Sequence, residues 1–263
     1  MSGLLKNSWK LATPLRSPLI SPLLFSIDGS LSPFVQQHLL SYWTLNSSLQ
    51  DSYGSNPLSI WTDSTPGGTP IFSSGLNNHL GNALSLGVHN FVGLSPNPFR
   101  LPPTTSTAYS YTSWFYQVSP PGKHYFGSWA VASASGWVVW PNNQPNVVYL
   151  AAANGTINDY FSMQTTVSGW FFLGIITAGN YISMTVNGNP LQTDSLTFTS
   201  GQDTNYWGYN PSVPVSGYQN GNNFLTQHLT AWNCPLSQNQ FNWLYNNGNG
   251  RNESEVIANM PMV

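Results

Sequence analysis

Residues that could catalyse a reaction are scarce in this chain. Its two glutamates, Glu253 and Glu255, both lie close to the C-terminus. A glycoside hydrolase needs two carboxylates that flank the scissile bond, and no such pair marks any of the strands predicted below. The sole cysteine, Cys234, has no motif that pairs it with a histidine, and the chain contains no Gly-x-Ser-x-Gly sequence. We therefore predict that the protein is not an enzyme.

Candidate metal ligands are equally scarce. The histidines show no spacing typical of a metal site, so we interpret each as a structural residue (His38, His79, His89, His124 and His228). Calcium needs about six to eight oxygen ligands, usually with more than one carboxylate. Asp51, together with backbone carbonyls, is the candidate calcium ligand, and the favoured alternative is that it caps a turn. We predict no cofactor, with calcium at Asp51 as the exception to test.

Flat aromatic rings and neutral amides suit the binding of sugars, and the chain is rich in both. It contains 11 tryptophans, more than one core easily uses. Strand alternation places Trp137 on the face opposite Trp140, so that one of the two belongs to the core. For any single ring, a place in the core or in an interface is the alternative to sugar binding. The candidate glycan-binding residues lie in two stretches, one of them loop-like (Tyr206, Trp207, Tyr209 and Asn210) and one after a short strand (Trp140 and Asn142).

The chain is poor in charge. Charged residues make up 5% of the sequence, against about 25% in ordinary soluble proteins. A surface of neutral polar groups can associate with copies or partners without the cost of desolvating charges. Six lysines and arginines argue against a nucleic-acid-binding surface, because phosphate contacts need clustered cations. No apolar stretch is long enough to cross a bilayer. The expected partners are therefore proteins and glycans, with neither nucleic acid nor membrane insertion.

The first 38 residues have a pattern of their own. A tetrapeptide with proline at its second position occurs three times between Thr13 and Leu24. These prolines forbid a continuous helix and favour an extended backbone, which also argues against a signal peptide. We predict an extended arm that docks in a groove of its own domain or of another subunit. Its basic and apolar residues would make the contacts (Lys6, Lys10, Leu15, Arg16, Leu19, Leu23 and Phe25).

From residue 39 onward, short alternating strands are separated by turn sequences. The stretch Ile182–Val186 alternates at the strand period, and the Asn187-Gly188 pair after it is typical of a tight turn. Strands at this spacing, with almost no helical periodicity, predict an antiparallel β-sandwich. The apolar residues of the tail would pack on the sandwich or on a neighbour. The chain then divides into three parts: an arm (1–38), the sandwich (39–250) and a C-terminal tail (251–263).

One short helix is predicted after the last strand. Ser237 and Gln240 have the spacing of a capping box, and Leu236 and Phe241 have that of a hydrophobic staple. The Asn-Asn-Gly sequence at 246–248 predicts a left-handed stop. The last strand therefore leads into a short helix that is pinned to an apolar surface.

Taken together, these segments resemble the laminin G-like domain of the concanavalin A-like lectin and glucanase superfamily. The resemblance covers roughly residues 39–250 and implies a jelly roll of two curved antiparallel sheets. Gln227 and His228 stand where many members carry acidic residues, and this departure weakens the case for calcium. The motifs occur in the family's order (Tyr42-Trp43-x-Leu45 with Asp51-x-x-Gly54, Gly81-Asn82-Ala83-Leu84, Ser113-Trp114, Trp170 ahead of Val186-Asn187-Gly188, and Trp232 with Leu236-Ser237).

The family includes secreted glycan-binding modules, adhesion proteins and phage fibre, tail and head-decoration proteins, so the fold does not decide the function. The arm, the low charge and the missing signal peptide favour a phage structural or decoration protein at the virion surface. Its partners would be other virion proteins or copies of itself, with surface glycans as further ligands. The alternative is a free-standing carbohydrate-binding lectin module, secreted or located at the cell surface.

Overall fold

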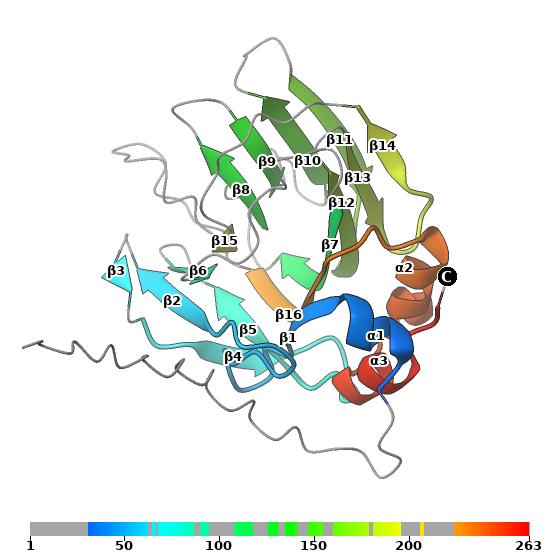
Figure 1. Ribbon diagram of the computed structural model, residues 1–263. Coiled ribbons are helices and arrows are strands. Elements are labelled where there is room, and N and C mark those ends of the chain that lie inside the picture. Colours follow the sequence, from blue (N-terminus) through cyan, green and yellow to red (C-terminus); the bar gives the residue numbers. More distant parts are fainter. Residues whose placement is uncertain are drawn as a thin grey trace, which may run out of the picture.

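Two antiparallel sheets make up most of the protein (Figure 1). The computed structural model describes residues 31–62, 65–66, 68–86, 90–94, 108–117, 126–130, 135–140, 147–154, 160–178, 181–195, 206–207 and 224–262. Within them, the first sheet has the order β14-β13-β12-β7-β16-β5-β4, and β1 pairs with the second half of β16. The second sheet has the order β11-β10-β9-β8-β15-β6-β2-β3.

The elements have the following bounds. The strands of the first sheet are β1 (Leu39–Trp43), β4 (Ile71–Ser74), β5 (Asn82–Leu86), β7 (Ala108–Gln117), β12 (Trp170–Ala178), β13 (Tyr181–Val186), β14 (Gln192–Asp194) and β16 (Phe224–Trp232). Those of the second sheet are β2 (Leu58–Thr62), β3 (Thr65–Pro66), β6 (Asn90–Leu94), β8 (Phe126–Ala130), β9 (Ser135–Trp140), β10 (Val147–Asn154), β11 (Tyr160–Thr166) and β15 (Tyr206–Trp207). The helices are α1 (Pro33–His38), α2 (Gln238–Tyr245), the 3₁₀ turn η1 (Asn246–Gly248) and α3 (Glu253–Asn259).

The main core lies between the two sheets. Alternate residues of β12 face it, and Phe171 and Ile175 belong to the same buried cluster as Val139 and Leu150 of the second sheet. This arrangement confirms the predicted all-β sandwich, and the two packed sheets suit a jelly roll.

The opposite face of the first sheet is also buried, because the three α-helices gather beside it (Figure 1). Phe172 and Ile176 of β12 belong to a second buried cluster with Phe34 of α1, Phe241 of α2 and Val256 of α3. Burial on both faces explains why β12 is a nearly continuous apolar run and not an alternating one.

The short helix predicted after the last strand is confirmed as α2. Ser237 Oγ accepts a hydrogen bond from the Gln240 backbone N–H, and the Gln240 side chain accepts one from the Ser237 backbone N–H at 2.9 Å. The left-handed stop is confirmed as well, with φ values of 49° at Asn246 and 52° at Asn247. The sequence pattern thus fixes both ends of this helix.

Two further helices lie where none is predicted. Residues 33–38 form α1 and so do not continue an extended arm, because burial of Phe34 and Val35 against the first sheet favours a compact turn. The tail forms α3 and packs on the sandwich through Val256 and Met260. The predicted docking residues of the arm lie outside the described residues. Among the helices of the described part, none is long and apolar enough to span a membrane.

Candidate functional site

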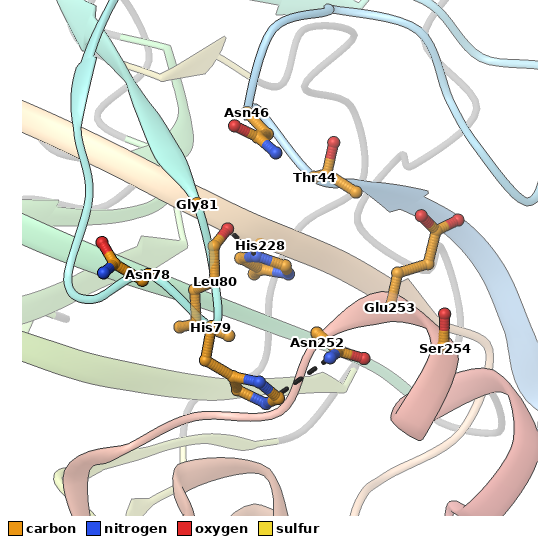
Figure 2. A pocket seen from close by; sticks show the side chains of 10 residues that line it. All are labelled: Thr44, Asn46, Asn78, His79, Leu80, Gly81, His228, Asn252, Glu253 and Ser254. Carbon is orange, nitrogen blue, oxygen red and sulfur yellow. Dashed lines mark hydrogen bonds between the residues drawn. The ribbon is translucent and has the colours of Figure 1, made fainter.

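A pocket of about 220 Å³ lies next to the start of α3 (Figure 2). Three segments form its walls: residues 44–46 after β1, residues 78–81 before β5, and residues 252–254. His228 of β16 completes the lining and is itself nearly buried. Among the lining residues that the structure describes, Leu80 is the one with a hydrophobic side chain, so this lining is polar.

A bulge in β16 brings His228 to this position. The register between β16 and β7 shifts between Gln227 and Thr230. At the bulge, His228 has a left-handed φ of 51°. Its backbone N–H donates to the carbonyl oxygen of Thr44, just past the end of β1, at 3.1 Å. The strand distortion therefore aims the imidazole at the loop before β5.

The His228 ring is held at both nitrogens. Its Nε2 lies 3.0 Å from the Leu80 carbonyl oxygen, and its Nδ1 lies 2.7 Å from the Tyr42 hydroxyl. A carbonyl can only accept, so Nε2 carries the proton and the Tyr42 hydroxyl donates to Nδ1. Burial lowers the pKa of His228 to about 4, and burial also raises the pKa of Tyr42. Both groups are therefore neutral at pH 7, and His228 has no free nitrogen for a proton or a metal.

The sole cysteine is equally unsuited to catalysis. Burial raises the pKa of the Cys234 thiol to about 11, so that it stays protonated at neutral pH, whereas the thiolate is the nucleophile. His228, the histidine nearest to Cys234 in the sequence, is hydrogen-bonded through both ring nitrogens, to Tyr42 and Leu80. These two groups therefore have neither the protonation state nor the free atoms that a nucleophile and its base require.

Uncharged groups of the pocket can hydrogen-bond to a ligand. Asn46 accepts a hydrogen bond from the Asn82 backbone at 2.8 Å through Oδ1, and within the described residues its Nδ2 has no partner. Gly81 has a φ of +80°, and a Cβ there would lie 2.6 Å from Asn46 Nδ2. Only glycine therefore leaves room for this amide. Further hydroxyl and amide groups line the same space (Thr44, Asn78 and Ser254).

Glu253 supplies a carboxylate to the pocket. Burial raises its pKa, a hydrogen bond with Ser52 opposes that rise, and the charge of Asp51 adds to it. The carboxylate is thus held in a partly desolvated place without a cationic partner of its own among the described residues. A ligand that donates hydrogen bonds would compensate this cost.

Glu255 ties the 78–81 loop to α3. One of its oxygens lies 2.8 Å from His79 Nε2 and accepts a hydrogen bond from the Asn252 backbone N–H at 2.9 Å. The other lies 3.4 Å from Arg251. Burial acts to raise the pKa of Glu255, but these three partners outweigh it and lower the pKa. The network holds two walls of the pocket in place relative to each other.

Asp51 caps the turn after β1. Its Oδ1 accepts hydrogen bonds from the backbone N–H groups of Tyr42, Tyr53 and Gly54 at 3.0, 3.1 and 2.8 Å, and its Oδ2 accepts one from Asn56 at 3.1 Å. Four amide donors thus stabilise the negative charge without a cation. In the described part of the chain, no group of three or more His, Cys, Asp or Glu residues is placed to hold a metal ion. These contacts favour the turn-capping alternative, and calcium at Asp51 stays a prediction.

Replacing Asp51 with alanine should lower the free energy of unfolding by about 2–4 kcal/mol, because several backbone donors lose their acceptor. Asp194→Ala is the matched control, since within the described residues that exposed carboxylate accepts one hydrogen bond, from the Ser195 backbone N–H. Urea unfolding measures both variants. A calcium chelator added to the unaltered protein should leave its unfolding midpoint unchanged; a drop would contradict the turn-capping role and restore calcium.

None of the predicted glycan-binding residues that the structure describes lines this pocket. Tyr206 and Trp207 form the short strand β15 between β6 and β8, where the sequence suggests a loop. Trp207 pairs with Val92 and Phe126, in a cross-strand row that continues to Val139, which is buried between the sheets. Tyr206 stands in the next row, paired with Gly93 and Gly127, so the two residues occupy successive strand positions.

The second predicted stretch is described in part. Trp137 is buried in the core. This agrees with the prediction that one of Trp137 and Trp140 belongs to the core. Trp140 ends β9 across from Tyr149. Asn142, Tyr209 and Asn210 lie outside the described residues. Glycan binding by this group and by β15 stays a prediction.

The pocket residues are not among those that the sequence predicts to bind a ligand. Asn252 and Glu255 have the spacing of a capping box, and the structure shows both of its hydrogen bonds. That signal could have predicted α3 and placed Glu253 in its first turn. For Asn46 and the 78–81 loop, no sequence pattern marks a site.

No protein-family model matches the chain, and no curated protein matches it. Solved structures do. Domain 4 of AbnA, an extracellular arabinanase from Geobacillus stearothermophilus solved with arabinotriose, is 16% identical with a TM-score of 0.54, over 78% of this chain and 98% of that one. The binding domain of botulinum neurotoxin serotype D is 14% identical with a TM-score of 0.57, over 82% of this chain and 53% of that one. The binding domain of botulinum neurotoxin DC, solved with SialylT, is 15% identical with a TM-score of 0.55, over 81% of this chain and 52% of that one.

These likenesses establish the class of fold, a β-sandwich of the kind found in those binding domains. The chain spans nearly all of the arabinanase domain and about half the length of the toxin domains. At these identities the likeness concerns the fold alone.

Proposed function

We propose that the chain is a non-catalytic β-sandwich module of the laminin G-like type that binds glycans. The observation that carries this proposal is the polar pocket beside α3, in which amide, hydroxyl and carboxylate groups have hydrogen-bonding capacity left over. Sugars are recognised by groups of this kind because each sugar hydroxyl both donates and accepts.

The similar folds add support. Two of the solved structures named above were determined with arabinotriose or SialylT bound. A non-catalytic role is supported by the state of His228 and Cys234, which leaves neither available for proton transfer or attack. The low charge of the whole chain also suits a neutral ligand.

A glycan array probed with the purified full-length protein tests this function. We expect selective binding to a subset of the glycans, and an array without bound spots would contradict the proposal. Trp207→Ala and Trp140→Ala test whether the predicted aromatic residues take part. A parallel incubation with a calcium chelator tests the remaining metal prediction.

A finer proposal concerns where the module acts. We propose that it belongs to the surface of a phage virion, as a structural or decoration protein anchored by its N-terminal arm. The recurrent Pro-Leu sequence of the arm and the 5% charged content favour assembly with other virion proteins or with copies of the chain. The alternative is a free-standing lectin module of a secreted or cell-surface protein.

Removing residues 1–30 separates these two locations, because α1 and everything after it stay intact. The anchored module should lose its association with copies or partners, as measured by analytical ultracentrifugation, and keep its glycan binding. An unchanged oligomeric state together with unchanged glycan binding would favour the free-standing lectin.

A further inference from the structure

We propose that the pocket beside α3 binds one neutral sugar unit, whose hydroxyls donate to the Glu253 carboxylate and accept from Asn46 Nδ2, and that it rejects acidic sugars. This inference rests on the proposed function and names the site and the class of sugar.

The size of the pocket suits a single sugar unit. Pockets for drug-sized ligands have volumes of about 300–1,000 Å³. The pocket here has a volume of about 220 Å³, is open to solvent, and is bordered by the 44–46 and 78–81 segments, His228 and the start of α3 (Figure 2). It therefore takes a small polar group, and the remainder of the glycan extends into solvent.

The hydrogen-bonding capacity that remains in the pocket matches a sugar with neighbouring hydroxyls. The Glu253 carboxylate can only accept, and Asn46 Nδ2 can only donate. The hydroxyls of Thr44 and Ser254 can do either. One sugar hydroxyl can donate to the carboxylate while its neighbour accepts from the amide, and a bond to a carboxylate is about twice as strong as one between neutral groups.

The frame around these groups is fixed before any ligand arrives. Asn46 is held by the Asn82 backbone and by the close approach of Gly81. The Leu80 carbonyl is held by His228. A site held in this way does not have to order its side chains on binding, and this preserves affinity.

The charges around the pocket exclude acidic sugars. The charge of Asp51 acts on Glu253, so the pocket wall at the start of α3 lies in the field of two carboxylates. Within the described residues Arg251 is the one lysine or arginine, and it is engaged with Glu255, with the Trp243 carbonyl and with the Trp243 ring, 4.7 Å from its centre. A sugar carboxylate would thus meet like charge without a free cation, and such repulsion is an effective source of specificity.

The test uses an array that carries lactose and arabinotriose among its neutral glycans and 3′-sialyllactose among its acidic ones. We expect the unaltered protein to bind neutral members and to leave sialylated and uronic-acid-bearing members unbound. Glu253→Gln and Asn46→Ala should each weaken binding about 10- to 100-fold, the effect of losing a hydrogen bond to a charged group or a well-placed donor.

Asp194→Asn is the matched control, because it removes the same charge from the exposed edge strand β14. Glu253→Gln should retain its thermal midpoint, since it removes a carboxylate that burial disfavours. Bound glycans with unchanged affinity in Glu253→Gln and Asn46→Ala, or a preference for acidic glycans, would overturn this inference and leave the proposed function standing. A blank array would overturn both.

Discussion

Lowering the pH from 7 to 4 is expected to remove about 3 kcal/mol of folding stability through His228 alone. Burial lowers the pKa of His228 from 6.5 to about 4, and each pKa unit corresponds to about 1.4 kcal/mol. Between these two pH values the unfolded chain binds a proton that the folded protein does not. The stability contributed by neutral His228 is therefore complete above pH 6.5 and is lost as the pH falls towards 4.

The measurement is urea unfolding at several pH values between 4 and 7, on the unaltered protein and on His228→Asn. Asparagine does not titrate and tolerates the left-handed backbone of this position. We expect the variant to be less stable at pH 7, because the Tyr42 hydroxyl and the Leu80 carbonyl lose their hydrogen-bond partner. Its stability should also depend less on pH. Subtracting the two profiles cancels the opposing effects of Glu253 and Glu255. Identical profiles would contradict the prediction.

Tyr42→Phe provides an independent check. The Tyr42 hydroxyl donates to Nδ1 of the neutral ring at 2.7 Å. Without that bond the neutral form of His228 is stabilised less relative to the protonated form, although the ring stays buried. As the pH is lowered, Tyr42→Phe should begin to lose stability at the same pH as the unaltered protein, but its total loss should be smaller.

The fold was predictable because its signals are local. Strand alternation around Ile182–Val186 and the capping box at Ser237 depend on residues a few positions apart, and the structure confirms both. Helix α1 was not predictable in the same way. Its six residues begin with proline and carry no cap hydrogen bond from a side chain, so its formation depends on tertiary burial of Phe34 and Val35.

The candidate site was not predictable because it is assembled from four distant segments. Asn46, Leu80, His228 and Glu253 meet only once β1, β5, β16 and α3 are packed together. His228 gives no sign in the sequence that it sits at a bulge, since a register shift is a property of strand pairing. The aromatic residues stand out in the sequence instead, because their high frequency is visible in the composition.

Phe241 is expected to carry the largest single share of the packing between α2 and the first sheet. Its side chain is fully buried in the cluster beneath the helices. The strand below it has a glycine, Gly174, and a Cβ there would lie 2.5 Å from the Phe241 ring and 2.8 Å from Thr185 Cγ2. The ring thus rests directly on the backbone of β12.

Phe241→Ala should lower the free energy of unfolding by about 3–5 kcal/mol, since it removes a buried ring and leaves a cavity. Gly174→Ala should cost about 1–3 kcal/mol, because its methyl group collides with that ring. In the double variant the methyl group enters space that the ring has vacated, so the combined loss should be smaller than the sum of the two single losses. Chemical denaturation of the four proteins measures this coupling. Strictly additive losses would mean that Phe241 and Gly174 do not touch, and the docking of α2 through this ring would be wrong.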